Sequence, residues 1–392
     1  MKRRRTDGLS ARFLGYAIIL LVIFGVTELA SYAFCHFVLV QRAPFLLYVP
    51  PRIDRAAWEH YLEVRDPILG WPTADALRTW HYDASGSRPV PAFPDPGKEC
   101  VTLYGDSFTY SEEVADEDAW GNLLAWWLGC RVGNFGVPGY GTDQALLRFE
   151  ANEADRAPVS ILGIYPEDVM RNVSQYFYLL GTRNGLSFKP RFSLADGELR
   201  LVPKPEPTFE QLKLLSSDLR RLLPYETFLP ETDLGPQPMR FPYTLVVLKL
   251  LFRHHRVRNW LLGVPSWQDF IQKDHPSHAQ EVTIRIAKRF MDGCKERGKK
   301  CFVVLFPTPS SYKHFIATER VVAQPLMGEF DKMAIPYLDL TPGFAEYVGV
   351  RGFCKMKIQT EQCTGHFNAE GNRLVAEVVR AYLVQHALHT VQ

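Results

Sequence analysis

Strong net charge is the first property that this 392-residue sequence lacks, because 45 basic and 43 acidic residues leave a formal net charge of only +2. Nucleic-acid-binding domains usually carry a clear basic excess, so we expect no nucleic-acid partner. The sequence also has no Walker loop and no dinucleotide fingerprint. It has no metal-ligand signature either, since the adjacent His254 and His255 cannot share a helix face. We therefore expect neither a cofactor nor a metal.

Apolar residues, in contrast, are plentiful. They make up 46% of the sequence, and aromatic residues make up 13%. This composition supports a sizeable core and excludes wholesale disorder. After an N-terminal apolar segment, the length leaves room for one large α/β domain or two modest ones.

The N-terminal segment predicts a membrane anchor. Four basic residues at positions 2–5 precede an apolar run over residues 13–40, which Glu28 alone interrupts with a charge. Residues 13–34 provide about the 20 residues that a membrane-spanning helix needs. A cleaved signal peptide has a shorter apolar region, and a buried helix of a soluble protein does not explain the basic cluster. The positive-inside rule then predicts a single-pass protein with a cytoplasmic N-terminus and a periplasmic or otherwise extracytoplasmic domain.

Seven cysteines are compatible with that location. Cys35 lies at the membrane edge, and the other six form three couples that are close in the sequence. Outside the cytoplasm an even set favours disulfides, although six cysteines allow fifteen pairings. Six unpaired, mostly buried thiols are the alternative. The three local couples are Cys100 with Cys130, Cys294 with Cys301, and Cys354 with Cys363.

Short apolar runs alternate with helical patterns along much of the chain, which is typical of a buried parallel sheet. Such a sheet places its functional site at the carboxyl ends of the strands. The first three runs end in polar or glycine-rich residues, as that rule requires. The five runs cover residues 100–108, 130–141, 159–165, 300–309 and 335–340.

Two other regions frame this pattern. Residues 1–40 form the tip and anchor, and the proline-rich residues 41–98 indicate a spacer with one short helix near 56–64. Residues 99–392 form the α/β domain, with an insertion at about 173–290 that shapes the substrate cleft. The insertion contains a predicted hairpin over 185–202 that turns at Asp196-Gly197. Its apolar and basic stretch 241–264 either packs on the domain or lies on the membrane surface.

Ser107 is the candidate nucleophile, because it follows the first apolar run in a Gly-Asp-Ser sequence. A serine hydroxyl needs a base to take its proton and donors for the developing oxyanion. The backbone N–H of Ser107 is one candidate donor. A helix N-cap is the alternative role for this serine.

The segments "GDSFTYSEEVADEDAWGNLL" and "NFGVPGYGTDQALLRFE" resemble the first two blocks of the SGNH (GDSL-like) hydrolase family. The resemblance is greatest to membrane-anchored members associated with bacterial cell-surface polysaccharides, and it covers about residues 98–175 and 300–385. It implies a flavodoxin-like three-layer fold with a parallel sheet of order 2-1-3-4-5. It also implies that Ser107 is the nucleophile and that the Gly139 N–H binds the oxyanion, where a missing Cβ permits close approach.

The third block departs from the family pattern. The family carries an asparagine directly before an aspartate there as a side-chain oxyanion donor, but Glu167 precedes Asp168 in this sequence. An ionised carboxylate cannot donate a hydrogen bond. Asn172 is a candidate replacement, and an oxyanion hole with two donors is the alternative.

The fifth block keeps the base but not the acid. In "QCTGHFNAEGN" the resemblance identifies His366 as the base, while Cys363 and Thr364 occupy the places of the triad aspartate. A Ser–His dyad, a backbone carbonyl or a remote acid such as Glu361 or Asp339 are the alternatives for this missing part.

The implied fold also favours the local disulfides. In the family's strand order the first two strands are neighbours, so the cysteines that precede them, Cys100 and Cys130, can meet. Cys294 and Cys301 flank a turn from a helix into a strand. A bridge between Cys354 and Cys363 closes the loop that carries His366.

These features together predict a serine esterase or deacetylase that acts on O-acylated carbohydrate outside the cytoplasm, through an acyl-enzyme on Ser107 with His366 as base. An O-acyltransferase that uses the same acyl-enzyme is one alternative. A catalytically inactive SGNH-like protein that binds polysaccharide or acts as a scaffold is another, and the missing acid and Glu167 favour it.

Overall fold

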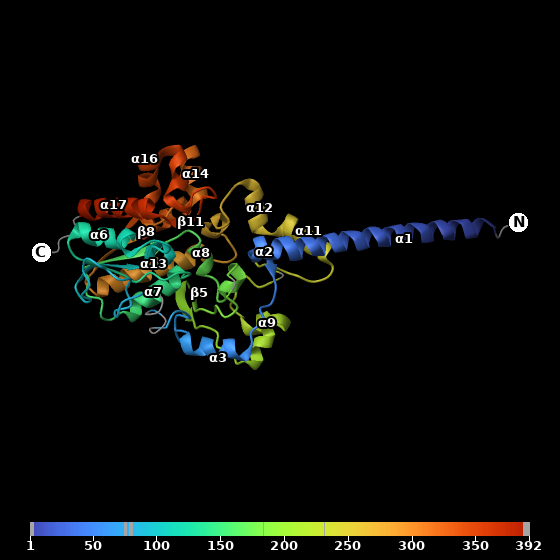
Figure 1. The fold of residues 1–392 in the computed structure, drawn as a ribbon, viewed down its shortest axis with the longest axis horizontal. Coiled ribbons are helices and arrows are strands. Elements are labelled where there is room, and N and C mark those ends of the chain that lie inside the picture. The colour runs from blue at the N-terminus through green and yellow to red at the C-terminus, as the bar shows by residue number, and fades with distance from the viewer. Residues whose placement is uncertain (1–3, 74–76, 78–80, 183, 231, 387–392) are drawn as a thin grey trace.

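A computed structural model describes residues 4–386 except 74–76, 78–80, 183 and 231, so two of the four N-terminal basic residues, Lys2 and Arg3, lie outside the described part. The long helix α1 (Arg4–Ala33) projects from a globular body (Figure 1). A π-helical turn η1 (Phe34–Leu39) and α2 (Val40–Arg42) continue it. Residues Arg12–Arg42 are long and apolar enough to span a membrane, and only 6% of their most apolar window is buried.

A five-stranded, fully parallel sheet forms the centre of the globular body. Its order is β3-β2-β4-β8-β9, which is the order 2-1-3-4-5 when the five strands are counted along the chain, as predicted. Every residue of β4 is buried, because helices cover both faces of the sheet. The strands are β2 (Glu99–Tyr104), β3 (Arg131–Asn134), β4 (Val159–Ile164), β8 (Lys300–Leu305) and β9 (Tyr337–Asp339).

Helices enclose the sheet as two outer layers (Figure 1). One face carries α7 (Thr142–Ala151), α13 (Ala279–Glu296) and α15 (Gln324–Lys332). These helices contribute to one core, which includes Phe149 from α7 and Phe290 from α13. The other face carries α6 (Trp120–Leu128), α14 (Pro309–Thr318), α16 (Leu340–Gly352) and α17 (Ala369–Gln385). The three-layer α/β class expected from the sequence is therefore confirmed.

The described parts of residues 41–98, which the prolines had indicated as a spacer, contribute side chains to the core of the domain. Helix α3 (Arg55–Val64) starts at Asp54, whose side chain accepts a hydrogen bond from the Ala57 N–H. Trp58, Tyr82 and Val90 are buried in the domain core. Prolines restrict the backbone but leave side chains free to be buried, so a proline-rich stretch is not necessarily a free linker.

The insertion contains the predicted hairpin and a helical arm. Strands β5 (Arg191–Ala195) and β6 (Glu198–Val202) pair antiparallel around Asp196 and Gly197, both with positive φ. Helices α11 (Tyr243–Arg253) and α12 (His255–Leu262) lie beside the start of the globular body, next to α1 and α2 (Figure 1). The smaller elements are β1 (Leu47–Tyr48), α8 (Asp168–Arg171), α9 (Leu214–Ser217), α10 (Leu219–Leu222) and β7 (Gln237–Pro238).

All three predicted disulfides are formed, namely Cys100–Cys130, Cys294–Cys301 and Cys354–Cys363. Cys35 is a buried free thiol. The first bridge joins the starts of the neighbouring strands β2 and β3. The third joins the 3-10 turn η7 (Phe353–Met356) to the loop before β11 (Thr364–Phe367).

Candidate active site

Ser107 lies just after the carboxyl end of β2, an inner strand between β3 and β4, as the first residue of the short helix α5 (Ser107–Tyr110). The preceding residue, Asp106, caps this helix: its side chain accepts hydrogen bonds from the N–H groups of Phe108 (2.9 Å) and Thr109 (3.4 Å). The cap holds the turn from strand to helix in place and leaves the Ser107 hydroxyl at the edge of the sheet.

His366 comes from the far end of the sequence. It lies on β11, which pairs antiparallel with β10 (Lys357–Gln359). The next residue but one, Asn368, caps α17 by accepting a hydrogen bond from the Gly371 N–H at 3.0 Å. The Cys354–Cys363 bridge closes the loop before β11, so both ends of the short strand are fixed.

The structure brings the predicted nucleophile and base together. His366 Nε2 lies 2.8 Å from Ser107 Oγ, a hydrogen-bond distance. The Ser107 hydroxyl can therefore pass its proton directly to the imidazole. Ser107 is almost fully buried, while about a fifth of the His366 side chain is exposed, so the pair faces the surface at the histidine.

The acid that sequence reasoning did not identify is Glu113. Its Oε2 lies 2.6 Å from His366 Nδ1 and also accepts a hydrogen bond from the His366 backbone N–H at 3.1 Å. Partial burial raises the pKa of Glu113, but these two hydrogen bonds and the charges of His366 and Lys357 outweigh it and lower the pKa below its usual value. Ser107, His366 and Glu113 thus have the geometry of a Ser–His–Glu triad, in which an ionised acid fixes the histidine tautomer and stabilises the imidazolium.

A left-handed turn after α5 places this acid. Ser111 (φ 66°) and Glu113 (φ 73°) both have positive φ, so the chain doubles back toward His366 within six positions of Ser107. The sequence "SEE" at 111–113 follows the nucleophile, but the family pattern predicts the acid just before His366, so Glu113 was not a candidate. Neither Glu361 nor Asp339, the remote acids considered from the sequence, takes this place.

Arg88 secures the turn that carries Glu113. This buried guanidinium donates hydrogen bonds to the carbonyl groups of Tyr110 (2.9 Å), Ser111 (2.7 Å) and Val114 (2.6 Å). It also pairs with Asp116 at 2.8 Å. Arg88 belongs to the proline-rich stretch 41–98, so that stretch supports the site rather than only leading to it.

Gly139 sits in a tight turn near α5. The Tyr140 N–H donates to the Val137 carbonyl at 3.2 Å, and Gly139 has φ 79°, as in a type II turn with Pro138 at its second position. Gly136 in the same loop contacts α5 closely, since a Cβ there would lie 2.5 Å from Tyr110 N. Among the described residues, the backbone N–H groups of Ser107 and Gly139 donate to no backbone carbonyl outside the regular helices and strands.

Asn172 does not fit the role expected from the sequence. Its side chain is fully buried, and its amide donates to Thr283 Oγ1 (2.9 Å) and Thr142 Oγ1 (3.3 Å). Its carbonyl oxygen accepts from the Asp143 N–H at 3.1 Å. Because both amide hydrogens are used inside the core, Asn172 joins helices rather than supplying an oxyanion donor.

A buried charge cluster lies beneath the nucleophile turn. Arg171 Nη1 contacts Asp168 Oδ1 (2.8 Å), the Tyr140 carbonyl (2.9 Å) and Asp106 Oδ2 (3.3 Å). Burial raises the pKa of Asp106 even though the charge of Arg171 opposes this shift. The cluster links α5, the glycine turn and α8, the helix that follows the third block.

Lys357 is a buried cation beside the triad. Its Nζ lies 4.3 Å from the centroid of the Phe367 ring and 4.6 Å from that of Phe108, and it donates to the Gly365 carbonyl at 3.2 Å. These contacts involve the direct neighbours of both Ser107 and His366. Burial lowers the pKa of Lys357 to about 7, against the attraction of Glu167, Asp106 and Glu113.

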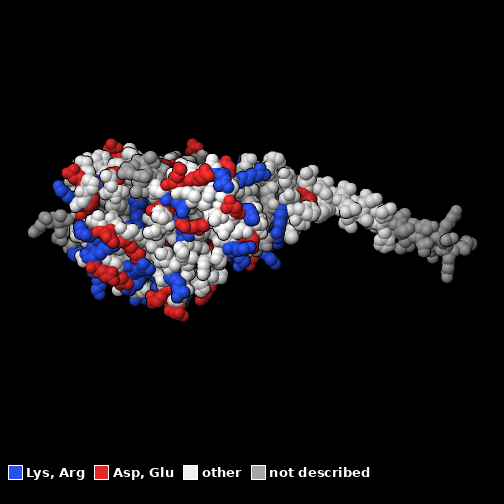
Figure 2. Space-filling view, turned by 90° about the horizontal axis from the view of Figure 1, so that it is seen from below, with Lys and Arg blue, Asp and Glu red and all other residues white. Residues whose placement is uncertain are grey.

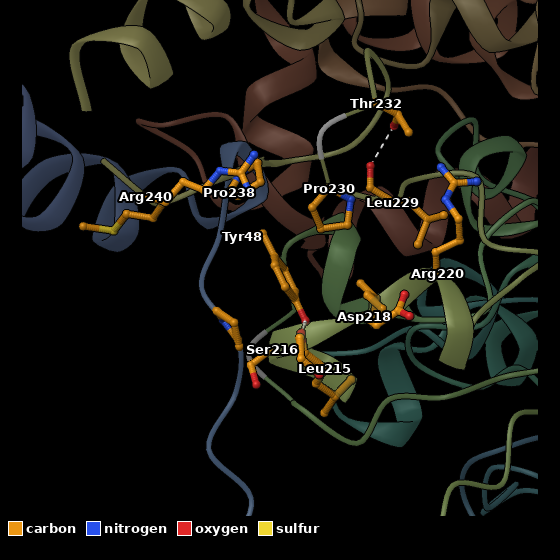
Figure 3. A pocket seen from close by; sticks show the side chains of 14 residues that line it. Tyr48, Leu215, Ser216, Asp218, Arg220, Leu229, Pro230, Thr232, Pro238 and Arg240 are labelled. Carbon is orange, nitrogen blue, oxygen red and sulfur yellow. Dashed lines mark hydrogen bonds between the residues drawn. The ribbon is translucent and has the colours of Figure 1, made fainter. Parts of the chain in front are cut away.

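A polar pocket of about 370 Å³ lies on the Gly139 side of the site. Glu167, Arg171, Phe177 and Ser266 are among the residues that line it. Phe177 borders the glycine turn, since a Cβ on Gly139 would lie 3.1 Å from its ring. A larger cavity of about 570 Å³ between Tyr48, Ser216 and Arg240 is lined by no triad residue (Figure 3). Within the described part of the chain, no cluster of side chains could hold a metal ion.

Comparison with known proteins finds only distant structural similarity. No family model and no curated protein matches the chain. A G-D-S-L family protein from Desulfitobacterium hafniense DCB-2 is 12% identical, over 72% of this chain and 97% of its own, with a TM-score of 0.34. TesA is 12% identical, over 72% of this chain and 97% of its own, with a TM-score of 0.35. A protein from Lactobacillus plantarum is 11% identical, over 74% of this chain and 98% of its own, with a TM-score of 0.34. At such distances no function transfers between chains, so the functional conclusion depends on the geometry of the site.

Proposed function

We propose that this chain is a serine esterase of the SGNH type with a Ser107–His366–Glu113 triad, anchored in a membrane by α1 and active outside the cytoplasm. The observation that supports this most is the pair of hydrogen-bond distances at His366, 2.8 Å to Ser107 Oγ and 2.6 Å to Glu113 Oε2. A nucleophile, a base and an orienting acid in this order are what ester cleavage through an acyl-enzyme requires. The scaffold alternative loses its main support, because the acid that seemed to be missing has a candidate.

The reaction would proceed in two stages. Ser107 Oγ attacks the ester carbonyl and its proton moves to His366 Nε2, while the N–H groups of Ser107 and Gly139 bind the oxyanion. The alcohol leaves with the proton from His366, and an acyl-enzyme remains. Water then attacks the acyl carbon as His366 takes its proton, and the carboxylic acid is released. Glu113 stays ionised throughout and stabilises the imidazolium.

An O-acylated carbohydrate is the substrate that we favour. The polar pocket beside Gly139 combines an aromatic ring, Phe177, with the polar side chains of Glu167, Arg171 and Ser266. Its volume of about 370 Å³ is in the range of small-molecule sites. Sugar rings suit such a lining, because their C–H faces can pack on an aromatic ring while their hydroxyls meet polar groups. The apolar α1 and the three disulfides support an extracytoplasmic location.

The proposal is tested by treating the full chain in detergent with a fluorophosphonate and mapping the adduct by mass spectrometry. We expect one adduct on Ser107, absent in Ser107→Ala and strongly reduced in His366→Ala. A folded protein that shows no adduct contradicts the proposal. Incubation of the unlabelled protein with an acetylated sugar, with and without a free sugar as acceptor, then separates the two reactions: hydrolysis releases acetate, and acyl transfer gives the acetylated acceptor.

A further inference from the structure

Helix α11 begins against α1, and a carboxylate from α1 satisfies its first backbone groups. Glu28 accepts hydrogen bonds from the N–H groups of Tyr243 (2.6 Å) and Thr244 (3.0 Å). The cap position of α11 itself is Pro242, which provides no side-chain cap. Within a bilayer, unpaired backbone N–H groups are very costly, so a helix that starts there needs such a partner. This arrangement also accounts for the one acid in the apolar run.

The start of α11 lies at a depth that α1 defines. The ring of Phe241 is 6.1 Å from that of Phe24, and Ser31 Oγ is 3.2 Å from Thr244 Oγ1. If Arg12 marks the inner boundary of the hydrocarbon, a rise of 1.5 Å per residue places Phe24 about 18 Å and Glu28 about 24 Å above it. Both depths are inside a core of about 30 Å. Phe241 then lies in the outer leaflet.

The outward surface of α11 and α12 is apolar and continues that of α1. Phe252 is 81% exposed and Trp260 is 77% exposed, values that are unusual for large apolar side chains clustered on a water-soluble surface. Lys, Arg, Asp and Glu are distributed over the globular body (Figure 2), whereas the part of α1 after Arg12 carries a single charged residue, Glu28. The other exposed apolar side chains of this surface are Phe241, Leu245, Leu248, Leu251, Leu261 and Leu262.

An apolar pocket of about 390 Å³ opens between these helices and the end of the anchor. Its lining includes Phe34, Leu250, Val257 and Trp260, together with a single cation, Arg256. The Arg256 guanidinium stacks 4.8 Å above the Phe45 ring and donates a long hydrogen bond, 3.5 Å, to the Leu180 carbonyl. It forms no ion pair with a carboxylate in the part of the chain that the structure describes. An apolar pocket whose one cation has no ion-pair partner among the described residues fits a phospholipid, with an acyl chain inside the pocket and the phosphate at the cation.

We propose that α11 and α12 dip into the outer leaflet beside α1 and that this pocket binds a bilayer phospholipid, with an acyl chain against Leu250 and Trp260 and the phosphate at Arg256. The proposal rests on the proposed anchoring by α1 but not on catalysis. Continuity with the apolar surface of α1 identifies the bilayer as the source of the lipid. Arg256 also lines the polar pocket with Glu167 and Arg171, so the phosphate of the bound lipid lies on the side that faces the candidate active site.

The test uses the full chain in vesicles of phosphatidylethanolamine and phosphatidylglycerol that contain a phosphatidylglycerol with a diazirine in its acyl chain. After irradiation, mass spectrometry locates the adducts. We expect adducts on α11 or α12 in addition to α1, which lies in lipid throughout. In Leu251→Trp, which fills the pocket, the adducts on the pocket-lining residues Leu250 and Trp260 should fall at least several-fold, while those on Phe252, which lies outside the pocket, should remain. In Arg256→Gln the adducts in the pocket should fall about tenfold, as expected for the loss of one charge-assisted contact.

Leu248→Trp is the matched control, because Leu248 is a similarly exposed leucine of α11 that does not line the pocket. Its adducts should remain as in the unchanged protein. Adducts confined to α1, or pocket adducts that Leu251→Trp leaves unaltered, overturn the proposal. Absence of lipid adducts from α11 and α12, together with a covalent dimer after treatment of the same vesicles with a bifunctional crosslinker, also overturns it, since a second copy then covers this surface. Fluorophosphonate labelling of Ser107 in the same vesicles reports separately on the proposed catalysis.

Discussion

Glu113 Oε2 and His366 Nδ1 lie 2.6 Å apart, although they are separated by 253 positions in the sequence. The acid belongs to the turn directly after the nucleophile, and not to the segment before the histidine. The site thus has the geometry of a serine triad, with the proposed acid supplied from another part of the chain.

Removing the charge of Glu113 should disable the site without unfolding the domain. We expect Glu113→Gln to lower the rate of fluorophosphonate labelling by up to about 10⁴-fold, because the histidine loses its tautomer control and the imidazolium its counter-ion. The adjacent Glu112, whose Oε2 is 3.6 Å from His366 Nε2, provides the control. If Glu112→Gln has the larger effect, the acid is assigned to the wrong residue.

The Cys354–Cys363 bridge should matter more for activity than its contribution to stability explains. It closes 9 positions and Cys294–Cys301 closes 7, so loss of either should cost a similar free energy of unfolding, about 2.5 kcal/mol. Of these two bridges, only Cys354–Cys363 braces the His366 loop. We expect the double serine variant of that pair to lose labelling at temperatures where it remains folded, and the Cys294–Cys301 variant to keep it. Equal labelling of the two variants would show that the loop needs no brace.

Asn172→Ala separates a core role from an oxyanion role. Because its loss removes the amide that donates to Thr283 and Thr142 and leaves the buried Asp143 N–H without its acceptor, we expect about 2 kcal/mol lower stability in denaturant unfolding. Labelling of the folded fraction should change little. An oxyanion donor would behave in the opposite way, with a rate loss of about 10²–10³ and little change in stability.

Lys357 should make stability depend on pH. Its pKa is about 7 in the folded protein, and about 10.4 is usual in an unfolded chain. Between these values the unfolded state binds a proton that the folded state lacks, so the stability of the unchanged protein rises with pH. Lys357→Met lacks this contribution. The difference in unfolding free energy between the two proteins should therefore grow in favour of the unchanged protein by about 1 kcal/mol per unit from pH 7 to 9.

Lys355→Met is the control for this measurement, because Lys355 is exposed on the adjacent turn. Its stability should differ from that of the unchanged protein by an amount that does not vary with pH. A pH-independent difference for Lys357→Met as well would mean that the aromatic rings around its ammonium keep the charge through this range.

The sequence was most informative where a single local signal determined the structure. Continuous apolar runs located the five strands, and Asp196-Gly197 located the hairpin turn. Ser107 and His366 stood in recognisable surroundings. Glu113 could not be found in this way, because its position depends on two left-handed residues and on Arg88 from a distant segment. The direction of the Asn172 side chain depends on α13, and the burial of residues 41–98 depends on the whole domain, so neither could be read from neighbouring residues.

The distribution of the triad along the chain also sets when a newly made protein becomes competent. Nucleophile and acid emerge together within seven positions, whereas the base emerges 253 positions after the acid, on the strand before the last helix. In the proposed enzyme, a chain that is still being synthesised therefore carries an unactivated serine until the segment with His366 has emerged, and esters near the site of synthesis are safe from it until then.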